Sequence, residues 1–193
     1  MYKHPEQRVG VFIDTANMYH SAKNLFGDNV NFGNILTEAV SGRRLLRAIA
    51  YAIHSKSEEE NSFFDALEKQ GFEVKQKDLQ IFSSGMKKAD WDVGIAMDAI
   101  KMADRLDTVV IVSGDGDFIP LVTYLQENKG CLVEVAAFGE TTSSRLIEHA
   151  DEFLNLSDNL SHFLIGSKKR GRKPLKSGVV NNKGTKRKRK ITF

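Results

Sequence analysis

The sequence predicts an α/β fold in which a mostly parallel sheet is covered by helices on both faces. Apolar stretches of strand type, such as residues 8–13, 108–113 and 131–138, alternate with stretches whose apolar residues recur at helical spacing. This alternation is typical of parallel sheets, whose crossover helices pack on both faces. The 193 residues are enough for one sizeable core, so we expect one domain, over residues 1–165.

The elements of the first half follow from the apolar pattern and the turn residues. They are a buried strand at 8–13 that ends at Asp14, a helix at about 17–26, a short helix at 33–41, a central strand at 44–53, a helix at 61–70 and a more exposed strand at 72–82. A helix is an alternative prediction for residues 44–53, because Leu, Arg and Ala are also common in helices. The helix at 61–70 is predicted to follow a capping-box pattern at 57–60 and to end at Gly71. Core positions are expected for Phe63, Phe64, Phe72 and Phe82.

The second half continues the alternation. Its predicted elements are a loop at 83–90, an amphipathic helix at 91–106, a strand at 108–113, a helix at 118–130, a strand at 131–138 and a last helix at 141–154. The buried stripe of the helix at 91–106 is predicted to consist of Val93, Ala96, Met97, Ile100 and Ala103. Pro120 is tolerated in a first helical turn, and Gly130 ends that helix.

Composition narrows the cellular context. No apolar stretch approaches the roughly 20 residues that span a bilayer, and the N-terminal residues lack the apolar centre of a signal peptide. We therefore expect no membrane partner. Cys131 is the single cysteine and lies in a strand-like stretch, so we expect a buried thiol and a reducing compartment, the cytoplasm.

The C-terminal segment from residue 166 is predicted to be a disordered, basic tail, because its apolar content collapses. Residues 168–193 hold twelve Lys and Arg and no acid, which leaves 16 basic and 25 acidic residues in the rest of the chain. This asymmetry indicates a polyanionic partner, RNA or DNA, and the alternative is a solubilising tail or a localisation signal. The tail residues expected to contact phosphates are Lys168, Lys169, Arg170, Arg172, Lys173, Lys186, Arg187, Lys188, Arg189 and Lys190.

Carboxylates gather where predicted strands end. Asp14 closes the first strand, and Asp115 and Asp117 follow the strand at 108–113. Carboxyl ends of parallel strands share one edge of the sheet, where ligands bind, so we expect these side chains to converge. Asp92 and Asp98 lie in the preceding helix, about 120° apart on an ideal helix, and face one site only if Asp92 lies in the entry turn.

Such a cluster, with no Lys or Arg among its members in the sequence, needs raised pKa values or a cation. Oxygen ligands without cysteine or adjacent histidine suit Mg²⁺ or Mn²⁺, which support phosphodiester hydrolysis. Each acid also has a simpler interpretation: Asp14 as a turn former, Asp115 in a plain turn, Asp117 or Asp92 as a helix cap, and Asp98 as a surface residue.

Four polar residues are expected to surround the acids as substrate-binding groups. Asn17 is either a helix cap or an amide that positions the substrate, and the Ser113 hydroxyl is expected to orient Asp115. Lys87 and Lys88 precede Asp92 and could contact a phosphate, although solvated loop lysines are the commoner case.

Three stretches resemble the motifs of the NYN domain, the LabA-like branch of the PIN-like nuclease superfamily. They are VGVFIDTANMY, KKADWDVGIAMDAI and VIVSGDGDFIPLV, in this order, and the resemblance covers about residues 8–157. It implies a PIN-like three-layer α/β/α sandwich and a Mg²⁺- or Mn²⁺-dependent ribonuclease site. The implied acidic centre is Asp14, Asp92, Asp98, Asp115 and Asp117, and Asn17 matches the family's asparagine. Trp91 departs from the family's smaller aliphatic residue.

These features favour a metal-dependent endoribonuclease. In the implied mechanism Asp14, Asp115 and one of Asp92 or Asp98 hold one or two metals, and Asp117 orients the attacking water or binds a second metal. The alternative is a non-catalytic nucleic-acid-binding or regulatory module on the same fold. A phosphatase acting on small phosphoesters is a third candidate, although the first strand lacks an Asp-x-Asp-x-Thr nucleophile motif.

Overall fold

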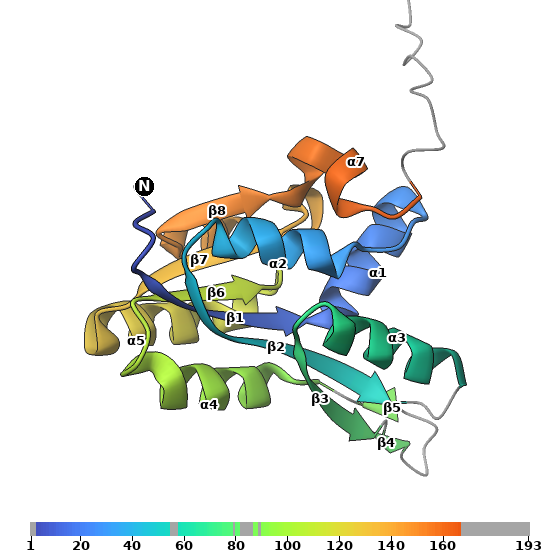
Figure 1. Cartoon of the computed structure of the whole chain (residues 1–193), viewed down its shortest axis with the longest axis horizontal. Helices are drawn as coiled ribbons and strands as arrows, with labels where there is room; N and C mark the ends of the chain where they lie inside the picture. Colours follow the sequence, from blue (N-terminus) through green and yellow to red (C-terminus); the bar gives the residue numbers. More distant parts are fainter. Residues whose placement is uncertain (1–2, 55–57, 79, 82–86, 89, 167–193) are drawn as a thin grey trace, which may run out of the picture.

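The computed structural model describes residues 3–54, 58–78, 80–81, 87–88 and 90–166. A six-stranded sheet forms its centre, in the order β3-β2-β1-β6-β7-β8, and every neighbouring pair in it is parallel (Figure 1). These strands are β1 (Arg8–Asp14), β2 (Arg44–His54), β3 (Glu73–Asp78), β6 (Thr108–Val112), β7 (Leu132–Ala137) and β8 (Glu152–Asn155). The short strands β4 (Gln80–Ile81) and β5 (Lys87–Lys88) form a separate antiparallel pair.

Helices connect the strands and cover the sheet on both faces. They are α1 (Thr15–Phe26), α2 (Phe32–Val40), α3 (Glu58–Lys69), α4 (Asp92–Ala103), α5 (Ile119–Lys129), α6 (Ser144–His149) and α7 (Leu160–Phe163). Short 3₁₀ helices are η1 (Gly116–Phe118), η2 (Gly139–Thr141) and η3 (Leu156–Asn159). The fold is therefore the α/β sandwich that the alternating pattern predicted.

The two faces of the sheet bury separate hydrophobic cores. Val9, Val11 and Ile13 of β1 join the core shared with α1, α2, α3 and α7, whereas Phe12 joins the core shared with α4, α5 and α6. This separation follows from the strand period of two, which sends successive side chains to opposite faces. Figure 1 shows α4 and α5 on one side of the sheet and α2 and α3 on the other.

The prediction of one helix over 141–154 is wrong. The segment forms η2 and α6, and then adds β8 as an edge strand beside β7. Because Glu134 pairs with Glu152 and the Asp151 backbone N–H bonds to the Val133 carbonyl, the chain gains ladder hydrogen bonds that helical continuation would forfeit. The local sequence pattern is helical, but pairing with a strand distant in the sequence determines the structure here. The spacing of residues along the chain does not encode such a pairing.

The predicted buried stripe of α4 is also partly wrong. Ile95, Ala99 and Ala103 are the buried residues, whereas Val93 is 73% exposed and Met97 is 48% exposed. Spacings of four residues place the buried three on one helical face. That face is selected by the packing of the helix on the sheet and α5, so the stripe lies to one side of the predicted one.

Most other core predictions are confirmed. Phe64 and Phe72 are buried, Phe63 packs against the core, and Cys131 is a buried free thiol. Residues 72–82 form β3 followed by β4, and part of the predicted loop at 83–90 pairs as β5. Phe82, the capping pattern at 57 and the tail from 167 lie outside the described residues, so those predictions and the domain boundary at 165 stay predictions.

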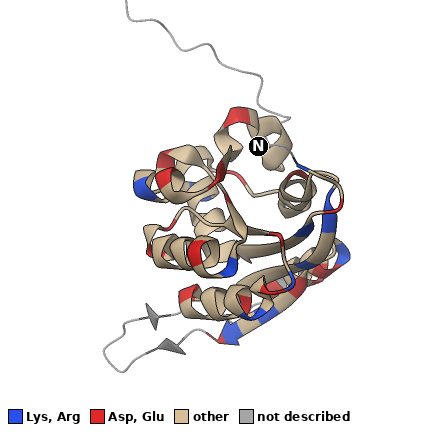
Figure 2. Ribbon diagram, turned by 90° about the vertical axis from the view of Figure 1, so that its left-hand side faces the viewer, with Lys and Arg blue, Asp and Glu red and all other residues tan. Residues whose placement is uncertain are grey.

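The charges of the body are mixed. Figure 2 shows acidic and basic residues interspersed over the helices of the described part. None of the helices described in this part of the chain is long and apolar enough to cross a membrane.

Candidate metal centre

The candidate site lies where the order of the sheet reverses. From β1 the chain adds β2 and β3 on one side and later β6, β7 and β8 on the other, so β1 and β6 lie side by side at the centre. Asp14 ends β1, and Asp115 follows β6 on the same edge of the sheet. This is the position at which open α/β sheets bind ligands.

Asp14 also caps the next helix. Its Oδ1 accepts a hydrogen bond of 3.0 Å from the Asn17 backbone N–H, so α1 begins at Thr15 rather than near 17. Burial, partly opposed by hydrogen bonds from the Asn17 and Ala16 N–H groups, raises the pKa of Asp14. The local interpretation of Asp14, at the turn after the strand, is thus observed, whereas Asp14 is not among the carboxylates whose oxygens gather within 4.8 Å of one another.

Asp115 is held in place by two short local contacts. Its backbone N–H donates to the Ser113 hydroxyl at 3.3 Å, and its Oδ1 accepts from the Asp117 N–H at 2.9 Å. Asp115, and not Asp117, therefore caps η1, and α5 begins after Phe118. Ser113 is fully buried, and its hydroxyl contacts the Asp115 backbone, as the expected role of orienting Asp115 requires.

Three carboxylates come together at this edge. Asp92, Asp115 and Asp117 each offer one oxygen, and these oxygens all lie within 4.8 Å of one another. Asp92 is the first residue of α4, and its N-cap Trp91 makes no side-chain capping bond. Asp92 therefore lies inside the first turn of the helix rather than in an entry turn before it, and its carboxylate lies beside those of the loop after β6.

The group carries a strong electrostatic cost. Burial, followed by repulsion from Asp115, Asp14, Asp90 and Asp117, raises the pKa of Asp92 to about 6. The donor set is entirely oxygen, as Mg²⁺ and Mn²⁺ prefer, so Asp92, Asp115 and Asp117 fit a divalent cation.

Asn17 connects the two halves of the site. Its side-chain Oδ1 accepts a hydrogen bond of 3.1 Å from the Gly114 backbone N–H. The first turn of α1, capped by Asp14, is thereby tied to the loop that carries Asp115. The helix-cap role left open for Asn17 is not observed, because its backbone donates to the cap and its side chain makes the cross-link.

The structure places Asp98 in a different environment from the three-carboxylate group. Asp98 Oδ2 accepts hydrogen bonds from the Tyr51 hydroxyl at 2.8 Å and from Lys75 Nζ at 2.6 Å. Burial raises the pKa of Asp98, but the bonds from Lys75 and Tyr51 outweigh it, and the net shift is downward. The assumption that no Lys or Arg accompanies the five acids is wrong for Asp98.

Sequence reasoning missed Lys75 and Tyr51. They face each other in the parallel pairing of β2 with β3, so both reach the same oxygen of α4. Two signals could have found them: a tyrosine in the buried, apolar second half of a strand needs a partner for its hydroxyl, and the charged residues 73, 75 and 77 alternate along one face of the exposed strand.

The glycines beside the acids lie where another segment of the chain passes close to the backbone. Neither Gly114 nor Gly116 has a positive φ. A Cβ on Gly114 would lie 3.1 Å from the Thr141 carbonyl oxygen, and one on Gly116 would lie 2.9 Å from the Ser143 hydroxyl. Glycine is needed because the segment before α6 crosses closely over this loop.

The remaining residues singled out from the sequence do not belong to the three-carboxylate group. Lys87 and Lys88 pair with β4 through their backbones, and their side chains lie outside the described part, as do the tail cations. Trp91 packs against Tyr51 with ring centroids 5.3 Å apart and donates a 2.9 Å hydrogen bond to the Ala52 carbonyl. Its indole therefore anchors the start of α4 to β2.

A groove of about 320 Å³ adjoins the acids between α4 and α5. Asp92 and Asp117 form part of its wall, and Val93, Phe118 and Tyr124 contribute apolar surface. A substrate bound at the carboxylates thus has access to a neighbouring hollow.

The protein is a parallel α/β sandwich with acidic residues at the edge where the strand order of the sheet reverses. Comparison with known proteins identifies its family. The NYN domain family matches residues 8–158, and the chain belongs to that family. A curated relative, the low amplitude and bright protein LabA of Synechococcus elongatus, is 26% identical over 159 residues, which cover 78% of this chain and 84% of the relative. A crystal structure of a protein of unknown function from Vibrio parahaemolyticus superimposes with a TM-score of 0.77 at 33% identity, covering 86% of this chain and all of that one.

Proposed function

We propose that this protein is a Mg²⁺- or Mn²⁺-dependent endoribonuclease that hydrolyses RNA phosphodiesters. The observation that carries the proposal is the convergence of Asp92, Asp115 and Asp117 within 4.8 Å at the carboxyl edge of the sheet. Membership of the NYN family, which is related to PIN-like nucleases, supports it. The raised pKa of Asp92 supports it as well, because uncompensated carboxylates at this spacing favour a bound cation.

We assign a metal-binding role to some residues of the site and a positioning role to others. Asp92, Asp115 and Asp117 would hold the cation, and Asp14 ends β1 at the same edge of the sheet. The cation supplies Lewis-acid stabilisation of the charge that develops on the phosphoryl oxygens. Asn17 and Ser113 position the backbone that carries Asp115. Preorganised carboxylates need no rearrangement as charge develops, which is the main advantage of such sites.

RNA is the proposed partner, and the basic tail is proposed to tether it. The body outside residues 168–193 holds 25 acids against 16 bases and would repel a polyanion, so the twelve tail cations offset that repulsion. Deleting residues 168–193 should weaken RNA binding and reduce its salt dependence. We also propose a cytoplasmic location, which the single, buried Cys131 supports.

The test is cleavage of mixed single-stranded RNAs by the full chain in Mg²⁺ or Mn²⁺. Asp115→Asn and Asp14→Asn should each lower the rate by a factor of at least about 100, as expected when a group acting on developing charge is lost. Asp65→Asn, an exposed acid on α3, is the matched control and should cleave like the wild type. Equal cleavage by the wild type and by Asp115→Asn would reject the proposal. RNA binding with no turnover in either metal would favour a non-catalytic binding module instead.

A further inference from the structure

A row of basic side chains leads away from the acidic group along one side of α4. The row begins on β3, where Lys75 and Lys77 stand two residues apart on one face of the strand, about 6.6 Å from one another along it. Lys77 Nζ lies 5.6 Å from the Trp91 ring centroid and donates to the carbonyl of Asp90, two residues before Asp92. This end of the row therefore reaches the entry of α4 beside the carboxylates.

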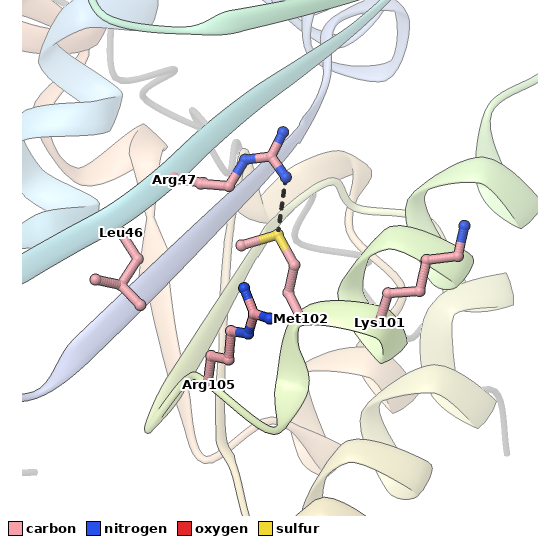
Figure 3. Close-up of a pocket in the computed structure, with 5 residues that line it drawn as sticks. All are labelled: Leu46, Arg47, Lys101, Met102 and Arg105. Carbon is pink, nitrogen blue, oxygen red and sulfur yellow. Dashed lines mark hydrogen bonds between the residues drawn. The ribbon is translucent and has the colours of Figure 1, made fainter.

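The far end of the row is a basic groove of about 280 Å³. It is lined by Leu46 and Arg47 of β2, by Lys101 and Met102 of α4 and by Arg105, which follows that helix (Figure 3). Figure 3 shows the guanidinium groups of Arg47 and Arg105 on either side of the Met102 sulfur, with Arg47 bonded to that sulfur at 3.8 Å. Lys101 follows Asp92 by nine residues, a rise of about 14 Å along the helix.

The acids that face this row leave it with excess positive charge. Glu73 binds the Arg47 guanidinium, and Asp98 binds Lys75. Among the described residues, Lys101 and Arg105 have no carboxylate partner, and both are exposed. In a body whose net charge is negative, five cations against two paired acids form a local positive surface, and such a surface concentrates phosphates.

From this arrangement we infer that Lys77, Lys75, Arg47, Lys101 and Arg105 form a track for the phosphate backbone of single-stranded RNA that extends from the acidic group to the far end of α4. The inference rests on the proposed function, since it takes an RNA strand as the substrate. Lys77 contacts residue 90, Lys75 contacts residue 98 and Arg47 contacts residue 102, so the cations are met in this order from the start of α4 to its end and can accompany one phosphate backbone. RNAs long enough to extend from the acidic group onto the track should therefore bind more tightly than RNAs that contact the acidic group alone.

The test uses binding rather than cleavage, in the full-length Asp115→Asn background, with single-stranded RNAs of two, six and twelve nucleotides. Adding Lys101→Gln and Arg105→Gln should weaken binding of the twelve-nucleotide RNA at least about tenfold at low salt and leave the dinucleotide unchanged. The slope of log affinity against log salt should fall by about 0.7 for each phosphate that the variant no longer neutralises. Lys101→Arg with Arg105→Lys should restore binding, because the track uses charge.

The matched control removes two cations elsewhere, Lys69→Gln on α3 and Arg145→Gln on α6. The inference is overturned if this control weakens the long RNA equally, if the dinucleotide suffers as much as the long strand, or if a duplex of the same length shows the same dependence on Lys101 and Arg105. It is also overturned if Asp115→Asn shows no preference for longer RNA. Wild-type cleavage decides the proposed function separately, because these binding measurements are made on an inactive chain.

Discussion

The side-chain oxygen of Asn17 accepts a hydrogen bond from the Gly114 backbone N–H at 3.1 Å, and this bond joins the segments that follow the two central strands β1 and β6, beside Asp14 and Asp115. Gly114 is buried, so its N–H has no ready replacement in water. The bond thus fixes the distance between the Asp14 turn and the Asp115 turn, which neither turn determines alone.

Asn17→Ala should loosen the metal site more than it harms the fold. Losing the acceptor leaves a buried N–H unpaired, which costs about 1–3 kcal/mol in the free energy of unfolding. We expect weaker Mn²⁺ binding by calorimetric titration, because the Asp115 turn is then free to move. Asn34→Ala is the control, since Asn34 Nδ2 makes a comparable 2.7 Å tie to the His162 carbonyl far from the acids. Equal loss of Mn²⁺ affinity in both variants would contradict the positioning role.

Asp92→Asn should raise the stability of the metal-free protein above pH 6. The folded-state pKa of Asp92 is about 6, above the ordinary value of 3.8, so the folded protein resists ionising this group. Wild-type stability therefore falls as the pH rises from about 4 through 6, and the neutral asparagine escapes that loss. Thermal melts in a chelator at pH 4, 6 and 8 should show a difference that grows with pH.

Adding Mg²⁺ or Mn²⁺ at pH 8 should then reverse the order, because a cation stabilises the ionised wild type by mass action. Asp65→Asn should show neither effect. A difference between Asp92→Asn and the wild type that is independent of pH would show that repulsion among these carboxylates is not its cause.

Asp98→Asn should separate a structural acid from a metal-binding one. The amide oxygen can still accept from Tyr51, but the ion pair with Lys75 is lost. We expect Mn²⁺ affinity within about twofold of the wild type and a loss of at most about 1 kcal/mol in the free energy of unfolding, since the pair is partly exposed. An effect on Mn²⁺ binding as large as that of Asp115→Asn would place Asp98 among the ligands.

Gly114→Ala should be more damaging than Gly116→Ala. The added methyl at 114 meets backbone atoms of Thr141 and Thr142 at 3.1 Å, which cannot rotate away, and overpacking of this kind costs about 1–3 kcal/mol. At 116 the nearest atom is the Ser143 hydroxyl, the end of a side chain. Denaturant unfolding should therefore show partial rescue of Gly116→Ala by Ser143→Ala and no rescue of Gly114→Ala. Equal losses for the two glycine variants would contradict this explanation.

The sequence alone determined the local chemistry. Continuous apolar stretches before Asp14 and Asp115 identified central parallel strands, because only a strand buried on both faces is apolar throughout. The position of those acids at strand ends then located the site. The motif order identified the family, which the comparisons confirm.

Tertiary structure alone decided what depends on contacts between distant segments. The face that α4 buries was set by packing on the sheet and α5, so Val93 and Met97 point outward although their spacing is helical. The strand β8 exists because β7 offers an open edge. Asp98 pairs with Lys75 because the register of β2 with β3 sets Tyr51 and Lys75 side by side. Gly114 and Gly116 are required by a segment some thirty residues later that crosses over them, and spacing along the chain carries no record of such an approach.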